Sequence, residues 1–455
     1  MNQEIIQKYS VPVPRYTSYP PANYFNDSFT AESYREAVIA SNDASPQHIS
    51  IYIHIPFCFR MCYYCGCNAM LLRSPASVEA YREALKKEMR LVLPLLSHGR
   101  KISQIHYGGG TPTSQPASFL QELNEIVLSE FDCIDQPEIA IECHPGYMDE
   151  TYWKTLPDIG FNRVSIGIQD FKEEVLRTPR RKGSRLPLED IVGWLREKQV
   201  SVNFDFIYGL PLQTRESFSE SIRHAVDIQP DRIVTFSYAH VPWVNPLQKK
   251  LEVAGLPGPV LKSNLFDDAA SILTHAGYKA IGMDHFVLPD DELYHALQEK
   301  TLARNFQGYC TRHTTGQVYA FGVTGISQLS NSYSQNVKDL DTYISMVNAG
   351  RLPVLKGYSL NREEQLAREV ISTLMCNYSV NWEEVASSAG VPVGQVKQAI
   401  HYDEQVLKAF ADDGILVFDE TAIHVLPEAA PFVRNVAAAL DKLMLHSDKK
   451  FSKSL

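Results

Sequence analysis

The chain has 455 residues, 44% hydrophobic and 21% charged, with a formal net charge of −10, a composition that predicts a large core and two domains. The acidic balance argues against nonspecific nucleic-acid binding but leaves room for a local basic pocket that takes an anionic substrate. No apolar run could cross a membrane, the opening segment 1–10 lacks the apolar stretch of a signal peptide, and the eight cysteines fit a reducing cytoplasm.

Residues 1–45 are predicted to form an arm without long regular elements, because Pro12, Pro14 and Pro20 interrupt it. Two interpretations fit its polar and aromatic segment 14–20. It either lies over a pocket or simply packs on the surface, and composition alone does not separate the two.

The first predicted strand, 49–55, leads directly into a cysteine-rich loop. Isoleucines alternate with polar residues along this strand, which is the period-2 pattern of a β-strand. Cys58, Cys62 and Cys65 follow with the spacing C-x3-C-x2-C, and Cys67 comes two residues later. Three thiolates on one tight loop suit three irons of a 4Fe–4S cluster and leave the fourth iron open to a small molecule.

This cysteine spacing resembles that of the radical SAM enzymes. In that family S-adenosylmethionine chelates the open iron, and electron transfer into its sulfonium releases a 5′-deoxyadenosyl radical. Zinc is the main alternative, because a C-x2-C pair alone more often binds zinc and either Cys67 or His54 would supply a fourth ligand. Disulfides are disfavoured in a long chain with few cysteines and no signal peptide.

Six strand–helix units follow one another along the chain. The strands are predicted at 49–55, 102–107, 138–143, 163–169, 201–207 and 232–238. The helices are predicted at about 77–93, with Ser77 as N-cap, and at about 116–129, 149–157, 187–198, 214–227 and 261–276. This alternation predicts an α/β fold with a parallel sheet, curled into a partial (β/α)6 barrel. Sites of such barrels lie at the carboxyl ends of the strands.

Glycine and polar residues recur at these strand ends. They are the glycine run 108–110, Thr111, Glu142, Gln169, Asp205 and Ala239 with its neighbours. Each one alone is compatible with an ordinary turn or a satisfied core polar group. Their recurrence at one end of successive strands favours a single large pocket.

The pattern changes after the sixth unit. A further strand is predicted at 278–283, and the stretches 304–309 and 319–327 are predicted to be loops and short strands that close the barrel mouth. A domain boundary falls near 350, so the chain divides into the arm at 1–45, a catalytic barrel at 46–350 and a C-terminal domain at 351–455.

The C-terminal domain is predicted to be mostly helical. An amphipathic helix opens at Asn361 and reaches about 376, and the stretches 410–417 and 422–425 suggest a small β-hairpin between helices. This arrangement is similar to winged-helix modules, but it lacks a basic cluster, which favours a structural or lid role over DNA reading. The basic tail at 446–455 is expected to be frayed.

Several segments together resemble the oxygen-independent coproporphyrinogen III oxidases, a radical SAM family, over nearly the whole chain. They are Pro14-Arg-Tyr-Thr-Ser-Tyr-Pro20, Tyr52-Ile-His-Ile-Pro-Phe-Cys58, Cys65-Gly-Cys67, Gly108-Gly-Gly-Thr-Pro-Thr113, Gly282-Met-Asp-His-Phe286 and Asn305-Phe-Gln-Gly-Tyr309. The resemblance implies oxidative decarboxylation of two propionates of coproporphyrinogen III to vinyl groups, giving protoporphyrinogen IX in haem biosynthesis without oxygen. It also implies a low-potential electron donor, an electron acceptor and a monomeric cytoplasmic enzyme.

The resemblance assigns roles to matching positions. The cluster ligands are Cys58, Cys62 and Cys65. A first S-adenosylmethionine is matched by Tyr52, Gly109, Glu142, Gln169, Arg181 and Ile326, with Arg181 and Glu142 expected at its carboxylate and amino group. A second is matched by Tyr64, Gly110, Thr111, Asp205 and Ala239. Further functional positions are His54, Cys67, Phe306 and Gln307. Arg15 and Arg304 are candidate partners for the carboxylates of the substrate.

Four departures from the family pattern bear on arginine placement and substrate choice. They are Tyr64 for phenylalanine, His144 for an acidic or amide residue, the unusually basic run 178–185 and Cys310 for threonine. Three other hypotheses are therefore kept: a haem chaperone, which Cys67 argues against, a radical SAM methyltransferase acting on a tetrapyrrole, and an inactive protein with the same fold.

Overall fold

Six parallel strands form the centre of the molecule. In the computed structural model, which describes residues 3–312, 314 and 316–454, they are β1 (Ile49–Ile55), β4 (Ile102–Gly109), β5 (Cys133–Cys143), β6 (Arg163–Gln169), β7 (Ser201–Tyr208) and β8 (Arg232–Ser237). Neighbours pair in parallel in this order. The four isoleucines of β1 are at most 1% exposed, because they face the helical layer. The predicted parallel barrel is confirmed.

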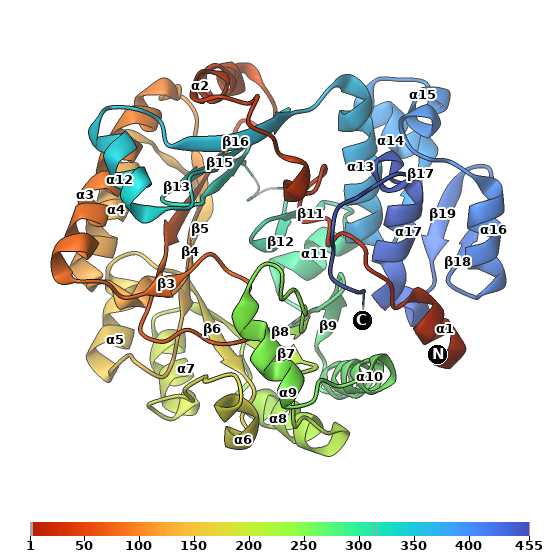
Figure 1. Cartoon of the computed structure of the whole chain (residues 1–455), viewed down its shortest axis with the longest axis horizontal. Coiled ribbons are helices and arrows are strands. Elements are labelled where there is room, and N and C mark those ends of the chain that lie inside the picture. Colours follow the sequence, from red (N-terminus) through yellow and green to blue (C-terminus); the bar gives the residue numbers. More distant parts are fainter. Residues whose placement is uncertain (1–2, 313, 315, 455) are drawn as a thin grey trace.

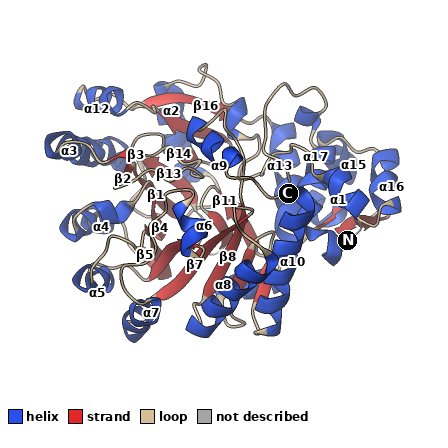
Figure 2. Cartoon of the chain, turned by 60° about the horizontal axis from the view of Figure 1, so that its bottom comes forward, coloured by secondary structure: helices blue, strands red, loops and turns tan. Residues whose placement is uncertain are grey.

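Helices cover the outer face of these strands (Figure 2). They are α3 (Pro75–Val92), α4 (Ala117–Glu130), α5 (Glu150–Asp158), α7 (Leu188–Glu197), α8 (Arg215–Ile228) and α10 (Pro259–His275). The short helices α6 (Glu173–Arg177) and α9 (Lys249–Val253) lie in connections. The predicted N-cap of α3 was wrong: the helix starts two residues earlier, and the Ser74 hydroxyl accepts the Ser77 N–H.

The central sheet is larger than predicted and has twelve strands among the described residues. At one edge β13 (Gln317–Phe321) pairs in parallel with β1, followed by the antiparallel strands β14 (Ile326–Gln328), β15 (Ser332–Asn336) and β16 (Val354–Ser359). At the other edge β10 (His285–Val287) pairs antiparallel with β8, and β9 (Lys279–Ile281) pairs antiparallel with β10.

The expectation that 319–327 only closes the barrel mouth was therefore wrong. Every residue of β13 is buried, as in a strand covered on both faces, and such a strand has no alternation to reveal it. Beside the sheet stand α11 (Glu292–Gln298), α12 (Leu340–Asn348), the pair β2 (Phe57–Cys58) with β3 (Met70–Leu71), and the hairpin β11 (Leu302–Asn305) with β12 (Gly308–Thr311).

The C-terminal residues form a second body beside the barrel (Figure 1). Its helices are α13 (Arg362–Asn377), α14 (Trp382–Ala389), α15 (Val393–Ala399), α16 (Glu404–Asp412) and α17 (Val433–Leu440). A three-stranded sheet joins them, made of β17 (Ser379–Asn381), β18 (Leu416–Phe418) and β19 (Ala422–Val425). Asn361 caps α13 through a capping box, and the body has its own apolar core.

The N-terminal arm packs on both bodies. It contains α1 (Gln3–Tyr9) and α2 (Ala31–Ala40). Its first half, including Tyr9, Tyr16 and Tyr19, belongs to the C-terminal core, whereas Phe29 and Tyr34 belong to the barrel core. The hydroxyls of Tyr16 and Tyr19 both donate to Asp441, at 2.9 and 3.1 Å. The boundaries at 45 and 350 stay predictions.

The C-terminal tail is bound to this arm, so the expectation of a frayed tail was wrong. Pro12 and Lys453 form an antiparallel bridge. The Val13 N–H donates to the Ser452 carbonyl at 3.1 Å, and the Ser454 N–H donates to the Val11 carbonyl at 3.0 Å. The arm and the tail thus satisfy each other's backbone groups.

Among the described residues, we find no helix with both the length and the apolar character needed to span a membrane.

Candidate active site

A cavity of about 660 Å³ lies inside the barrel and opens toward the arm and the β11–β12 hairpin. Nine predicted site residues line it: Tyr52, His54, Cys67, Gly109, Glu142, Asp205, Phe306, Gln307 and Ile326. The other predicted residues lie outside this lining: Cys58, Cys62, Tyr64, Cys65, Gly110, Thr111, Gln169, Arg181 and Ala239. Arg15 and Thr17 of the arm also line the cavity, so segment 14–20 does lie over a pocket.

The three predicted cluster ligands are free thiols: Cys58 ends β2, and Cys62 and Cys65 lie on the loop between β2 and β3. The Thr111 hydroxyl donates to Cys58 Sγ at 3.4 Å, and the Cys67 N–H donates to Cys65 Sγ at 3.4 Å. In residues 3–312, 314 and 316–454, no three His, Cys, Asp or Glu side chains converge as ligands of a single metal ion. Three cysteines on one short segment, two of which accept hydrogen bonds, fit a cluster that takes one cysteine per iron.

Two amides that the sequence analysis missed hold the cysteine loop in place. Gln248 is completely buried, and its Nε2 donates to the carbonyls of Tyr64 at 2.9 Å and Ala239 at 3.3 Å. Asn245 Nδ2 donates to the Cys65 carbonyl at 2.6 Å. These contacts bring together Tyr64 and Ala239, which the sequence analysis grouped at one ligand. An amide in a loop gives no periodic signal that would have revealed this role.

His54 is neutral and fixed in one tautomer. Its Nε2 lies 3.0 Å from the Asn68 carbonyl, which can only accept, so Nε2 carries the proton. Its Nδ1 then accepts the Tyr52 hydroxyl at 3.1 Å. Burial lowers the pKa of His54 to about 4. The ring therefore ties strand β1 to the segment that carries Cys67.

The glycine run after β4 allows a close approach between strands and loop. Gly109 has φ +111°, and a Cβ there would lie 2.5 Å from the His54 ring. A Cβ on Gly110 would lie 2.6 Å from the Pro56 carbonyl oxygen. The Gly109 N–H donates to Glu142 Oε2 at 3.3 Å. Only glycine fits these two positions, and the result is a backbone N–H directed toward the cavity wall.

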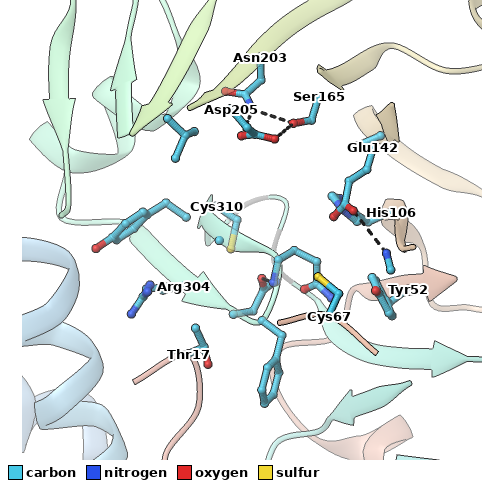
Figure 3. A pocket seen from close by; sticks show the side chains of 18 of the residues that line it. Thr17, Tyr52, Cys67, His106, Glu142, Ser165, Asn203, Asp205, Arg304 and Cys310 are labelled. Carbon is cyan, nitrogen blue, oxygen red and sulfur yellow. Dashed lines mark hydrogen bonds and ion pairs between the residues drawn. The ribbon is translucent and has the colours of Figure 1, made fainter. Parts of the chain in front are cut away.

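Carboxylates occupy two neighbouring walls of the cavity (Figure 3). Glu142 Oε1 lies 3.3 Å from His106 Nε2. Asp205 accepts hydrogen bonds from Ser165 Oγ at 2.6 Å and Asn203 Nδ2 at 2.8 Å. Burial raises the pKa of Asp205 to about 6. The cavity therefore presents one accessible carboxylate and one half-buried carboxylate that is held by polar side chains.

Arg181 lies at the end of β6, just outside the cavity lining. It is hydrogen bonded to the Gly167 carbonyl, and its buried Nε has no partner among the described residues. A Cβ on Gly167 would lie 2.7 Å from the Arg181 guanidinium. His144 lies close by, and burial together with Arg181 lowers the pKa of His144 to about 2. A guanidinium whose Nε donor lacks a protein partner has the chemistry to bind an anion.

Cationic side chains gather at the mouth of the cavity. Arg15 Nη2 donates to the Ser237 carbonyl at 2.9 Å, and Arg304 Nη1 donates to the Tyr16 carbonyl at 3.2 Å. Burial, followed in size by the positive charge of Arg15, lowers the pKa of Lys262 to about 7. Arg304 also has a buried Nε without a partner in the part of the chain that the structure describes. The mouth therefore has spare donors for carboxylates.

The β11–β12 hairpin supplies the remaining wall. Phe306 contacts Tyr333 edge to face, with ring centroids 6.3 Å apart. The Oε1 atom of Gln307 is buried and has no partner among the described residues. Cys310, one of the departures from the family pattern, also lines the cavity.

The floor of the cavity is polar, and sequence analysis missed it. Gln104 Nε2 donates to Glu138 at 2.7 Å, and Arg163 Nε donates to the same carboxylate at 2.6 Å. Burial opposes ionisation of Glu138, but Arg163 and Arg232 outweigh it and lower its pKa to about 2. Polar residues at alternate positions of successive strands were the available signal, because alternate side chains of a barrel strand point inward.

The chain is similar to known proteins over nearly its whole length. The Radical SAM superfamily matches residues 52–225. The chain is 35% identical to the oxygen-independent coproporphyrinogen III oxidase of Synechocystis sp., covering 99% of this chain and 97% of the relative. It is 36% identical to the Helicobacter pylori enzyme of that name, covering 99% of both. A solved structure of coproporphyrinogen III oxidase from Escherichia coli, described as a radical SAM enzyme, superposes with a TM-score of 0.86 at 35% identity, covering 94% of this chain and 97% of that one.

Proposed function

Because the chain belongs to the family of oxygen-independent coproporphyrinogen III oxidases, we propose that it removes CO2 oxidatively from two propionates of coproporphyrinogen III. The products are two vinyl groups on protoporphyrinogen IX. The observation that carries this proposal is one cavity lined both by the cysteine loop and by the cations of the mouth. The haem chaperone and the methyltransferase are not favoured by the comparisons.

The family uses a 4Fe–4S cluster with S-adenosylmethionine, which together supply a primary carbon radical able to abstract an unactivated propionate hydrogen. Cys58, Cys62 and Cys65 would hold the cluster. The chain's own contribution is to bind, orient and exclude water around this chemistry. His54 and Tyr52 would fix the loop, because their hydrogen bonds join β1 to the segment after Cys65.

We assign the first S-adenosylmethionine to the wall between β4 and β6. Arg181 would bind its carboxylate, since the buried Nε of this guanidinium lacks a partner among the described residues. Glu142 would bind its ammonium group, and the Gly109 backbone would lie against it. Tyr52, Gln169 and Ile326 complete the set that the family resemblance implies.

A second S-adenosylmethionine belongs to the proposal as well. Asp205 would bind its ribose or ammonium group, because this carboxylate faces the cavity and is held by two neighbours. Tyr64 and Ala239 are joined through Gln248. Gly110 and Thr111 complete this set.

The substrate carboxylates would bind at the mouth. Arg15 and Arg304 line the cavity, and Arg304 retains a buried donor. Guanidinium groups suit carboxylates because they offer two parallel N–H bonds. Phe306, Gln307 and Cys67 would contact the tetrapyrrole or the reacting propionate. The low-potential electron donor, the electron acceptor, a monomeric state and a cytoplasmic location are further parts of the proposal, supported by the need to keep the cysteines reduced.

The test is an anaerobic assay of the protein after iron–sulfur reconstitution. It contains S-adenosylmethionine, dithionite, an electron acceptor and coproporphyrinogen III, and mass spectrometry follows 5′-deoxyadenosine and the porphyrins. We expect loss of two CO2 per substrate, absent in Cys62→Ser and retained in the matched variant Cys133→Ser. Formation of 5′-deoxyadenosine with the substrate unchanged would refute the oxidase and move the search to other tetrapyrroles.

A further inference from the structure

A basic and apolar surface surrounds the cysteine loop, and the proposed reaction does not use it. We call it the cluster-loop face. Its exposed members are Phe59, Arg60, Leu71, Leu72, Arg177, Arg180, Lys182, Arg185, Trp243, Val244, Lys249 and Lys250. It includes the basic run 178–185 that departs from the family pattern.

Direct contacts join the three segments of this face. The Tyr63 N–H donates to the Pro179 carbonyl at 2.9 Å, which ties the cysteine loop to the basic run. Lys250 Nζ lies 3.2 Å from the Tyr63 hydroxyl, and Arg180 lies over the same ring at 5.6 Å. Asn245 adds the hydrogen bond to the Cys65 carbonyl. The face is therefore built on the loop that carries the cluster ligands, and Figure 2 shows α6 and α9 at this end of the barrel.

The charge of the face is opposite to that of the protein. The stretches 56–74, 176–187 and 241–251 contain no Asp or Glu. Glu173 and Glu174 precede the second stretch and Glu189 follows it, while Glu252 directly after the third stretch is paired with His240 at 2.7 Å. The whole chain carries a net charge of −10, so cations concentrated here mark a local preference for an acidic partner.

Apolar side chains lie among these cations. Phe59 is 42% exposed, Leu71 56%, Trp243 48% and Val244 61%. Large apolar side chains with a charged rim are typical of surfaces that bind another protein. Trp is also the residue type most enriched among those that dominate binding energy.

We propose that the cluster-loop face docks a small acidic protein that carries a low-potential flavin. The proposal rests on the proposed function, since the cluster must receive an electron. The partner's flavin hydroquinone gives up one electron and becomes a semiquinone, the cluster gains that electron, and no atom is transferred. The position of the face around the cluster ligands favours a redox protein over other polyanions, which have no reason to bind there.

The experiment reverses three charges of the face, in Arg177→Glu/Arg185→Glu/Lys249→Glu. The matched control reverses three exposed charges elsewhere, in Lys101→Glu/Lys198→Glu/Lys408→Glu. A bacterial flavodoxin reduced to the hydroquinone is the probe, and anaerobic stopped-flow measures bleaching of the cluster without substrate. Calorimetry measures flavodoxin affinity at low and high salt.

We expect the face variant to slow cluster reduction by flavodoxin about ten- to a hundredfold at low salt, because steered association depends on such charges. The control variant should match the wild type, and dithionite should reduce all three proteins equally. Because this readout needs no tetrapyrrole, it stays informative if the proposed decarboxylation fails.

Three results would overturn the proposal. The first is unchanged reduction of the face variant by flavodoxin. The second is an equal loss with dithionite, which would mean damage to the cysteine loop. The third comes from sedimentation with phosphatidylglycerol vesicles. If the face variant keeps normal flavodoxin kinetics but, unlike the wild type, no longer sediments with the vesicles, the face belongs to a membrane surface instead.

Discussion

Replacing Gln248 with methionine should loosen the cysteine loop, because Gln248 is not itself a proposed ligand but holds the backbone of Tyr64 and Ala239, which are. Methionine matches glutamine in length and shape but cannot form its hydrogen bonds. The change removes the two bonds to the Tyr64 and Ala239 carbonyls and the 2.6 Å bond from the Val241 N–H to Oε1. Three backbone groups lose their partner at a position that is completely buried.

The size of the effect follows from these three groups. A buried backbone group left unpaired costs about 1–3 kcal/mol. Segment 239–250 lies near the surface, so water reaches the groups once the loop opens and the low end of that range applies. We expect about 3 kcal/mol in total, or roughly a hundredfold increase in local opening.

Two measurements check this expectation. Hydrogen exchange should show faster exchange of the Val241 amide and its neighbours, and the reconstituted cluster should be lost faster to a chelator. Gln298→Met, at the exposed end of α11, is the matched control and should behave as the wild type. Unchanged exchange and unchanged cluster loss in Gln248→Met would refute the idea that this amide braces the loop.

Four further predictions concern the cavity. Asp205→Asn should raise stability by about 3 kcal/mol above pH 7 and by nothing below pH 4, because burial holds the folded pKa of Asp205 at about 6 and the unfolded chain ionises first; denaturation across pH measures this, and a constant difference would contradict it. His54, with a folded pKa of about 4, should make stability rise between pH 4 and 6.5 by up to about 3 kcal/mol, and urea titrations of His54→Gln should lack that slope. Gly109→Ala should cost about 2 kcal/mol or more in thermal unfolding, whereas Gly99→Ala, with open space around it, should be near neutral. Arg304→Gln should raise KM for coproporphyrinogen III about tenfold with little change in kcat, and a fall in kcat alone would argue against carboxylate binding.

The sequence was sufficient for the barrel because its signals are local. Isoleucine alternation predicted β1, and each strand–helix pair repeated the same pattern, so strand order followed from chain order. Strand β13 was not predicted as part of the central sheet, because a parallel strand buried on both faces shows no alternation of apolar and polar residues. Its pairing with β1 joins residues far apart in the chain, and no local pattern encodes such a pairing.

The residues of the candidate site also fall into those that local motifs predict and those that depend on contacts between distant segments. The cysteine spacing and the glycine run could be read directly, since their chemistry depends on short distances along the chain. Gln248 and the Arg163–Glu138 pair of the floor could not, because each depends on which distant segments meet. The binding of the tail to the arm was missed for the same reason, and charge alone suggested a frayed end.

The pairing of the arm with the tail has a consequence for synthesis on the ribosome. The arm is made first and the barrel with its cysteine loop next, whereas the partners of the first half of the arm, α13 to α17 and residues 452–454, are made last. Domains fold largely in the order in which they are made. The first half of the arm therefore cannot dock until the C-terminal body has been made, whereas Phe29 and Tyr34 can already pack on the barrel. The order of translation thus delays closure of the cavity mouth by Arg15 and Thr17 until the C-terminal body is present.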